Sequence, residues 1–197
     1  MKQTEIHLHQ TTSLTPEEYV AGLTDFGLGR SKLFANSADK CLKVHRLGLS
    51  EADVTEGSGG VWERLHYDWS DPNHVLLKTT DSNVWGGASG HTYTFTRQPG
   101  GTTNIDVVVV REGKNFKGRV LGFVLRTIGR SVLQKVFQNS VKTIENRKEA
   151  ARDQAMASMS TFWSTPCTHN CFRPSNSACA TLANPMPSAP SNVARTE

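Results

Sequence analysis

Apolar and polar residues alternate along much of the first 150 residues. In the first run, residues 4–11, Ile6 and Leu8 share one face while His7 and His9 share the other. A period of two predicts a strand. Paired glycines or an Asp-Pro-Asn turn separate several of the later runs, and such short connections favour antiparallel pairing. We therefore expect strands at 4–11, 42–50, 52–57, 60–70, 73–81, 90–98 and 102–112.

Two short helices are predicted after the first strand. Thr15 can cap a helix because its hydroxyl accepts a backbone hydrogen bond, and Pro16 suits the first helical position. We expect this helix over residues 16–24. Gly27 and Gly29 interrupt it, and a second short helix is expected around residues 31–35.

A long helix is predicted from Phe116 to about residue 149, because apolar residues recur there every three or four positions. Glycines at positions 118, 122 and 129 weaken its first turns, since a helical glycine costs about 1 kcal/mol relative to alanine. We expect a kink or a separate short helix near residues 122–129. Arginines interrupt the apolar run, which argues against a membrane-packing role for the Gly-x-x-x-Gly spacing.

The composition changes near residue 150. Residues 151–197 hold five of the eight prolines and are rich in Ala, Ser, Thr and Asn. Such a segment buries too little apolar area to offset the entropy of ordering it. We predict one folded domain over residues 1–150 and a flexible low-complexity tail over residues 151–197.

The four cysteines and the N-terminus bear on the compartment. Three cysteines lie in the last part of the chain, a distribution unlike that of a disulfide-stapled secreted domain. The first residues lack the apolar stretch of a secretory signal, and no run of about 18 apolar residues exists. We expect a cytoplasmic protein with reduced thiols and no stable membrane insertion.

Two patterns could bind a metal. His7 and His9 share a strand face but have no evident third ligand nearby. Cys167, His169, Cys171 and Cys179 could complete a tetrahedral zinc site, although their spacing is not that of a common zinc knuckle. The Gly27–Lys32 segment lacks the spacing of a phosphate loop. We expect neither a metal nor a cofactor.

The formal net charge of the 197-residue chain is only +4. One basic cluster stands out, which we interpret as a solvated strand end and helix start. It could instead bind an acidic surface or an unidentified protein partner. No aromatic residues interleave with these cations, which argues against nucleic-acid binding. The cluster comprises Arg111, Lys114, Lys117, Arg119, Arg126 and Arg130.

The order of these elements resembles the helix-grip fold of the SRPBCC superfamily, which includes START lipid-transfer domains, birch-pollen-allergen-like proteins and polyketide cyclases. Three stretches carry the resemblance: Ile6-His-Leu-His with Thr15-Pro-Glu-Glu-Tyr19, then Gly60-Val-Trp-Glu-Arg-Leu65 through Trp69, then Gly90-His-Thr-Tyr-Thr-Phe95 with Ile105–Val110. The whole is most similar to actinobacterial polyketide cyclase/dehydrase-like proteins. The resemblance implies an α+β fold in which six to seven curved antiparallel strands wrap a long C-terminal helix around a deep cavity.

Alternation along the strands sorts their residues into inward and outward faces. Glu63, Tyr67, His91, Tyr93 and Arg97 are expected to be the inward polar residues, while Trp85 lies near a glycine-rich turn at the cavity mouth. We predict that the ligand-binding residues are Leu65, Tyr67, Trp69, Trp85, Phe95, Arg97, Val107, Val109, Leu125 and Ile128.

The resemblance leaves two functions open. The first is a binding protein that holds a hydrophobic small molecule, a lipid or a polyketide-like compound, without chemistry. The alternative is a polyketide cyclase, aromatase or dehydratase in which His91, with Tyr93 or Glu63, moves protons. Large amphipathic side chains on a half-buried sheet also commonly serve packing alone. Whether the chain is an enzyme therefore stays open.

Overall fold

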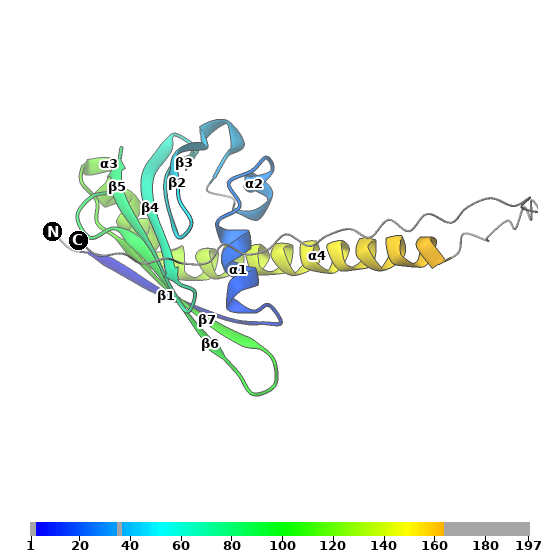
Figure 1. The fold of residues 1–197 in the computed structure, drawn as a ribbon. Helices are drawn as coiled ribbons and strands as arrows, with labels where there is room; N and C mark the ends of the chain where they lie inside the picture. Colours follow the sequence, from blue (N-terminus) through cyan, green and yellow to red (C-terminus); the bar gives the residue numbers. More distant parts are fainter. Residues whose placement is uncertain (1–2, 35–36, 164–197) are drawn as a thin grey trace, which may run out of the picture.

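The computed structural model describes residues 3–34 and 37–163 (Figure 1). Its centre is a seven-stranded antiparallel sheet, which confirms the predicted fold class. Each observed strand begins and ends within about three residues of its predicted bounds. The strands are β1 (Thr4–Thr12), β2 (Lys43–Leu47), β3 (Glu51–Ser58), β4 (Val61–Asp71), β5 (His74–Ser82), β6 (Gly90–Arg97) and β7 (Thr103–Arg111).

The sheet order is β1-β7-β6-β5-β4-β3-β2, so the first strand pairs with the last. Ile6 lies opposite Val109 and Leu8 opposite Val107. Strands β2 to β7 form a meander of hairpins, whereas the connection from β1 to β2 crosses from one edge of the sheet to the other. That connection carries the short helices.

Helix α1 (Pro16–Leu23) begins as predicted. The Thr15 hydroxyl accepts a hydrogen bond from the Glu18 backbone N–H, and the Glu18 carboxylate accepts one from the Thr15 N–H, so both ends of a capping box are formed. Helix α2 (Arg30–Leu33) and a 3₁₀ turn, η1 (Asp39–Cys41), follow. These elements cover one end of the sheet beside the long helix (Figure 1).

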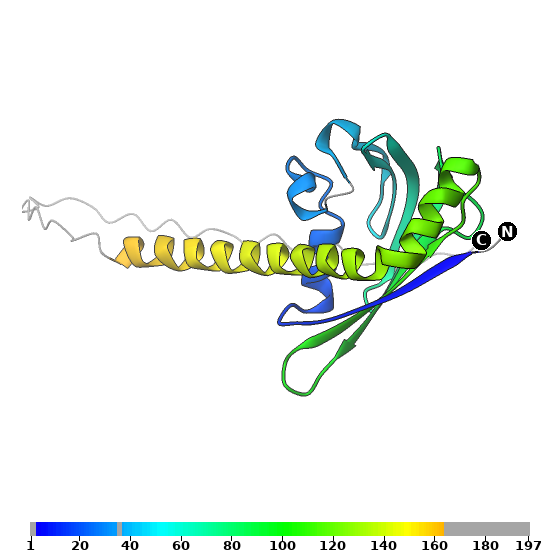
Figure 2. The ribbon, with the colours of Figure 1, turned by 180° about the vertical axis from the view of Figure 1, so that it is seen from behind.

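The long C-terminal helix comprises α3 (Phe116–Val124), the π-helical turn η2 (Leu125–Gly129) and α4 (Arg130–Trp163). The predicted kink near residues 122–129 is present at η2, where α3 turns away from the axis of α4 (Figure 2). A π turn inserts an extra residue and bends a helix in this way.

Helix α4 continues past the predicted domain boundary. Its apolar packing on the body ends near Ile144, and Arg147 and Lys148 still form ion pairs with Asp25 and Glu18. Residues 151–158 are exposed on a helix that projects beyond the sheet (Figure 1). The prediction that the helix ends near residue 149 is therefore wrong, because α4 continues to Trp163. Alanine-rich sequence explains the difference, because alanine has the highest helix propensity. Residues 164–197, with their cysteine cluster, lie outside the described residues.

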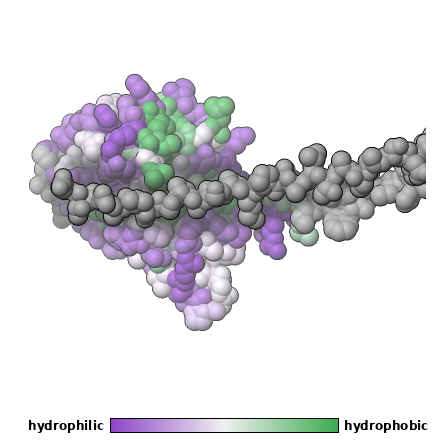
Figure 3. All heavy atoms as spheres, in the orientation of Figure 1, coloured by the Kyte–Doolittle hydropathy of each residue, from purple (hydrophilic) through white to green (hydrophobic). Residues whose placement is uncertain are grey.

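The core lies between the concave face of the sheet and α4. Alternate strand residues point into it, among them Val54, Leu65 and Ile105, and Phe137 and Val141 approach from α4. Hydrophilic residues cover most of the face shown in Figure 3, where apolar side chains gather at the upper part. Among the described helices, none is both long and apolar enough to cross a membrane.

Candidate functional site

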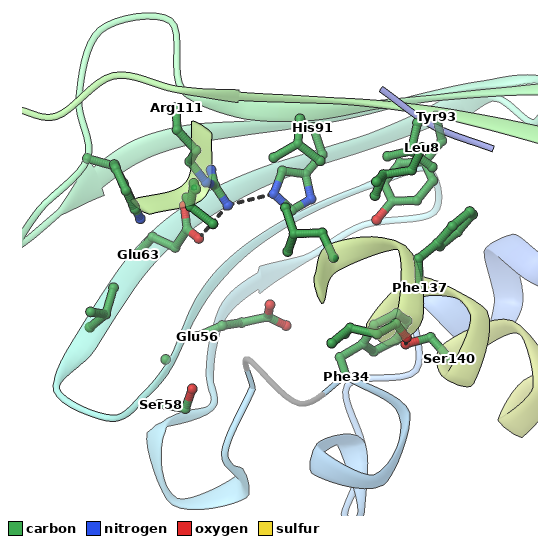
Figure 4. A pocket seen from close by; sticks show the side chains of 18 of the residues that line it. Leu8, Phe34, Glu56, Ser58, Glu63, His91, Tyr93, Arg111, Phe137 and Ser140 are labelled. Atoms are coloured by element: carbon green, nitrogen blue, oxygen red, sulfur yellow. Dashed lines mark hydrogen bonds and ion pairs between the residues drawn. The ribbon is translucent and has the colours of Figure 1, made fainter. Parts of the chain in front are cut away.

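A cavity of about 350 Å³ lies between the sheet and the long helix. This volume falls in the range of small-molecule sites, and most of the lining is apolar. The space stays open because a single helix is too narrow to cover the whole concave face of a seven-stranded sheet. Figure 4 shows the side chains of β1, β3, β4, β6 and β7 facing those of α4 across it. The apolar wall includes Leu8, Val107, Val109, Leu125, Leu133 and Phe137.

One wall of the cavity carries a buried polar cluster of Glu63, Arg111, His91 and Thr79. The Arg111 guanidinium donates to Glu63 through both nitrogens, from Nη2 to Oε1 at 3.0 Å and from Nη1 to Oε2 at 3.2 Å. Thr79 Oγ1 donates to the same carboxylate at 3.0 Å. The guanidinium also lies 5.5 Å from the centroid of the Trp85 ring. Such a bidentate pair satisfies its charges internally and is rigid.

His91 is held in one tautomer by this cluster. Arg111 Nη2 lies 2.6 Å from His91 Nε2, and because a guanidinium has no acceptor, it donates to an unprotonated Nε2. The proton of the neutral ring is then on Nδ1, which has no hydrogen-bond partner among the described residues. Burial first, and then the charge of Arg111, holds the pKa of His91 well below its usual value. His91 thus presents a neutral N–H donor at the cavity wall.

A second buried ion pair holds Glu56, which also lines the cavity. Arg30 Nε lies 2.5 Å from Glu56 Oε1, and both side chains are almost fully buried. Arg30 also donates to the carbonyls of Leu23 and Asp25 and, at 3.0 Å, to the Tyr67 hydroxyl. These bonds tie the α1–α2 connection to the sheet and fix the Glu56 carboxylate at the cavity lining (Figure 4).

Two tyrosine hydroxyls on the cavity lining have no partner among the described residues. The Tyr19 hydroxyl is fully buried and unpaired within that part of the chain. Tyr93, whose ring centroid lies 6.0 Å from that of Tyr19, likewise has no hydrogen-bond partner there for its hydroxyl. Burial raises the pKa of both phenols, so both stay protonated. An unpaired buried hydroxyl costs about 1–3 kcal/mol, which a guest with a hydrogen-bonding group would recover.

Several residues singled out from the sequence meet at this cavity. All three predicted catalytic residues, His91, Tyr93 and Glu63, line it (Figure 4). Four of the predicted ligand-binding residues line it as well: Trp85, Val107, Val109 and Leu125.

Other predicted ligand-binding residues lie elsewhere in the interior. Leu65, Tyr67 and Phe95 point inward as expected, but they belong to the packed core and not to the cavity lining. The Phe95 ring packs against Tyr19 of α1, and the Tyr67 ring against Phe26 of the α1–α2 connection. Trp69 is only partly buried, and its indole N–H donates to the Leu49 carbonyl at 3.1 Å. Alternation predicts which face of the sheet a side chain is on, but it does not predict which part of each strand the helices cover.

Two predictions about the lining are wrong. Arg97 is exposed and forms an ion pair with Glu17, because it lies at the end of β6 beyond the part of the sheet that the helix covers. Ile128 is also exposed, since the π turn rotates it outward while Leu125 of the same turn faces the cavity.

The placement of Arg111 in the solvated basic cluster is wrong as well, because this side chain is buried at the cavity. The signal is present in the sequence, since Arg111 has the same parity along β7 as Ile105, Val107 and Val109. Sequence reasoning also misses Glu56 and Tyr19 as lining residues. Glu56 shares its parity along β3 with the buried Ala52 and Val54, so alternation could have placed it on the inner face. That Tyr19 of α1 meets the cavity depends on how α1 packs in three dimensions.

Metal-binding patterns find no support in the described part of the chain, which holds no group of three or more His, Cys, Asp or Glu side chains suited to a metal ion. His7 Nε2 pairs with Glu5 and His9 Nδ1 with Asp106 on the exposed side of the sheet. The zinc site considered at Cys167–Cys179 lies outside the described residues.

Comparison with known proteins finds no matching family model and no match among curated proteins. Solved structures do match. The Zhui aromatase/cyclase from Streptomyces sp. R1128 aligns with a TM-score of 0.59 at 11% identity, covering 76% of this chain and 98% of that one. Norcoclaurine synthase from Thalictrum flavum, in complex with dopamine and hydroxybenzaldehyde, aligns with a TM-score of 0.53 at 12% identity, covering 74% and 88%. The protein TTHA0849 from Thermus thermophilus gives 0.53 at 18%, covering 75% and 98%.

These likenesses, together with the sheet order and the long helix, identify the fold. The chain has a helix-grip fold like that of its structural neighbours, which include the Zhui aromatase/cyclase. At these identities the comparison establishes the fold alone.

Proposed function

We propose that this protein binds a hydrophobic small molecule, a lipid or a polyketide-like compound, in the cavity between the sheet and the long helix. The observation that carries the proposal is the cavity itself, about 350 Å³ with predominantly apolar walls. Apolar walls favour an apolar guest because its transfer from water releases roughly 25 cal/mol per Å² of buried surface.

The polar groups of the lining narrow the class of guest. The His91 Nδ1–H can donate to a carbonyl or ether oxygen, and the unpaired Tyr19 and Tyr93 hydroxyls can donate or accept. A guest with oxygen atoms on an otherwise apolar skeleton would satisfy all three. A pure hydrocarbon would leave the buried Tyr19 hydroxyl unpaired.

Proton transfer by His91, which the enzyme alternative requires, fits this geometry less well. A general base needs a free lone pair and a pKa near the working pH. The Nε2 lone pair of His91 accepts from Arg111, and its pKa is well below its usual value. The geometry therefore favours a hydrogen-bonding role for His91, and binding without acid–base chemistry is the function we propose.

Native mass spectrometry of the full chain after gentle purification tests this proposal. We expect a fraction of the protein to carry an added mass that disappears under denaturing conditions, and organic extraction should release an apolar compound containing oxygen. A protein that stays empty, and that is not stabilised against heat by any lipid or aromatic polyketide-like probe, would contradict the proposal.

A further inference from the structure

The outer face of α3, η2 and the first turn of α4 carries an exposed apolar stripe. We use this name for Phe116, Val120, Phe123, Ile128 and Val132, whose spacing of three to five residues places them along one side of the helix. Phe116 is 82% exposed, Phe123 67% and Ile128 61%. No other described element covers them, and Figure 2 shows α3, in green, at the end of the molecule opposite the projecting part of α4.

Five cationic side chains lie on the same helical stretch as the stripe, and that stretch has no acidic residue. Residues 116–144 contain no Asp or Glu. On the adjoining strands, Glu5 is paired with His7 and Asp106 with His9. The five cations form no ion pair with any carboxylate of the described residues; they are Lys117, Arg119, Arg126, Arg130 and Lys135.

The cations and the stripe meet at one hollow. Arg119 and Arg126 line it together with Phe123 and with the backbone of Gly118 and Gly122, in a space of about 480 Å³. Apolar side chains that lie between unpaired guanidinium groups are complementary to a surface with an apolar interior and an anionic outer layer.

We propose that this face docks onto an anionic lipid bilayer, with the stripe in the interfacial region and the cations among the headgroup phosphates. The helix would lie in the plane of the membrane, since no described helix is fit to span it. A second copy of the chain is a poor occupant, because a two-fold interface would bring each arginine cluster against its own copy.

The face also adjoins the cavity. Leu125 lines the cavity while Ile128, three residues on in the same π turn, points outward into the stripe. Docking would therefore place lipid against the turn that forms part of the cavity wall. The docking proposal stands on the exposed residues alone and does not depend on the proposed function.

Vesicle co-sedimentation of the full chain tests the docking. We expect binding to vesicles of phosphatidylcholine mixed with phosphatidylglycerol, little binding to phosphatidylcholine alone, and weaker binding as salt rises. Arg119→Gln with Arg126→Gln should lower the partition coefficient on the order of thirtyfold, since each cation near the surface contributes about fivefold. Phe116→Ser with Phe123→Ser should lower it as well.

The matched control is Lys142→Gln with Arg152→Gln, which removes the same charge from exposed positions of α4 away from the stripe. Its partition should stay within about twofold of the wild type. All variants should keep the wild-type melting temperature, because none of the replaced side chains is buried. Failure to bind anionic vesicles, equal binding to both kinds of vesicle, or equal losses in the control and the Arg119/Arg126 pair would overturn the proposal.

Discussion

Arg111 Nη2 lies 2.6 Å from His91 Nε2 and 3.0 Å from Glu63 Oε1, so one guanidinium holds a carboxylate and an imidazole together at the cavity wall. The arrangement keeps His91 neutral and directs its Nδ1–H away from Arg111. Two consequences follow, one for the pH dependence of stability and one for the cost of removing Arg111.

Stability should fall as the pH drops below about 6.5, because unfolded His91 takes up a proton there and folded His91, with its lowered pKa, does not. The slope from this residue is at most about 1.4 kcal/mol per pH unit. His91→Gln removes this contribution while its amide oxygen can still accept from Arg111. Urea unfolding of both proteins between about pH 7 and about pH 5 measures the difference. A constant difference across that range would contradict the account.

Arg111→Leu should lower the free energy of unfolding by roughly 3–5 kcal/mol, because it leaves the Glu63 carboxylate buried without a counter-charge. Replacing both residues by leucine should recover most of the loss. Lys114→Ala, which breaks the exposed pair with Asp81, is the control and should cost less than about 1 kcal/mol. A double variant no more stable than Arg111→Leu would show that the pair is not the cause.

Two buried tyrosines should respond in opposite ways to loss of the hydroxyl. The Tyr67 hydroxyl accepts from Arg30 Nη2 at 3.0 Å, so Tyr67→Phe should destabilise the protein by about 1–3 kcal/mol. The Tyr19 hydroxyl is buried without a partner among the described residues, so Tyr19→Phe should leave the empty protein unchanged or more stable. Chemical denaturation of the delipidated chain compares them, and a large loss in Tyr19→Phe would mean that the hydroxyl is satisfied.

Alanine substitutions at Gly118 and Gly122 of α3 should differ in their effect on the free energy of unfolding. A Cβ at Gly118 would overlap the Val84 carbonyl oxygen, whereas at Gly122 the nearest atom is Thr4 Oγ1 at 3.8 Å. Gly118→Ala should therefore cost roughly 1–3 kcal/mol through overpacking. Gly122→Ala should be neutral or gain up to about 1 kcal/mol from helix propensity. Similar effects of the two substitutions on thermal stability would contradict the close approach of α3 to Val84.

Local patterns predicted much of this fold. The Thr15 cap of α1, the alternation along β6 and β7 and the kink at the glycines near η2 each depend on neighbours within a few residues, and each prediction agreed with the structure. The end of α4 was predicted too early, because composition alone does not distinguish an exposed alanine-rich helix from coil.

The site could be predicted only in part. Strand parity placed His91, Tyr93 and Glu63 on the inner face, but whether an inner residue meets the cavity or the core depends on which part of the sheet a helix covers. The parity prediction fails in two ways. Tyr67 lies in the core beneath the α1–α2 connection, and Arg97 lies past the end of the covered part of the sheet. Long-range packing decides both.

The most direct test of the cavity uses two residues of the same π turn. Leu125→Trp should fill the cavity, whereas Ile128→Trp adds the same ring to an exposed position. Titration with the neutral fluorophore phenylnaphthylamine should show tight binding to the wild type and to Ile128→Trp, and at least roughly tenfold weaker binding to a folded Leu125→Trp, about 1.4 kcal/mol. Equal affinity for all three proteins would show that the guest does not enter this cavity.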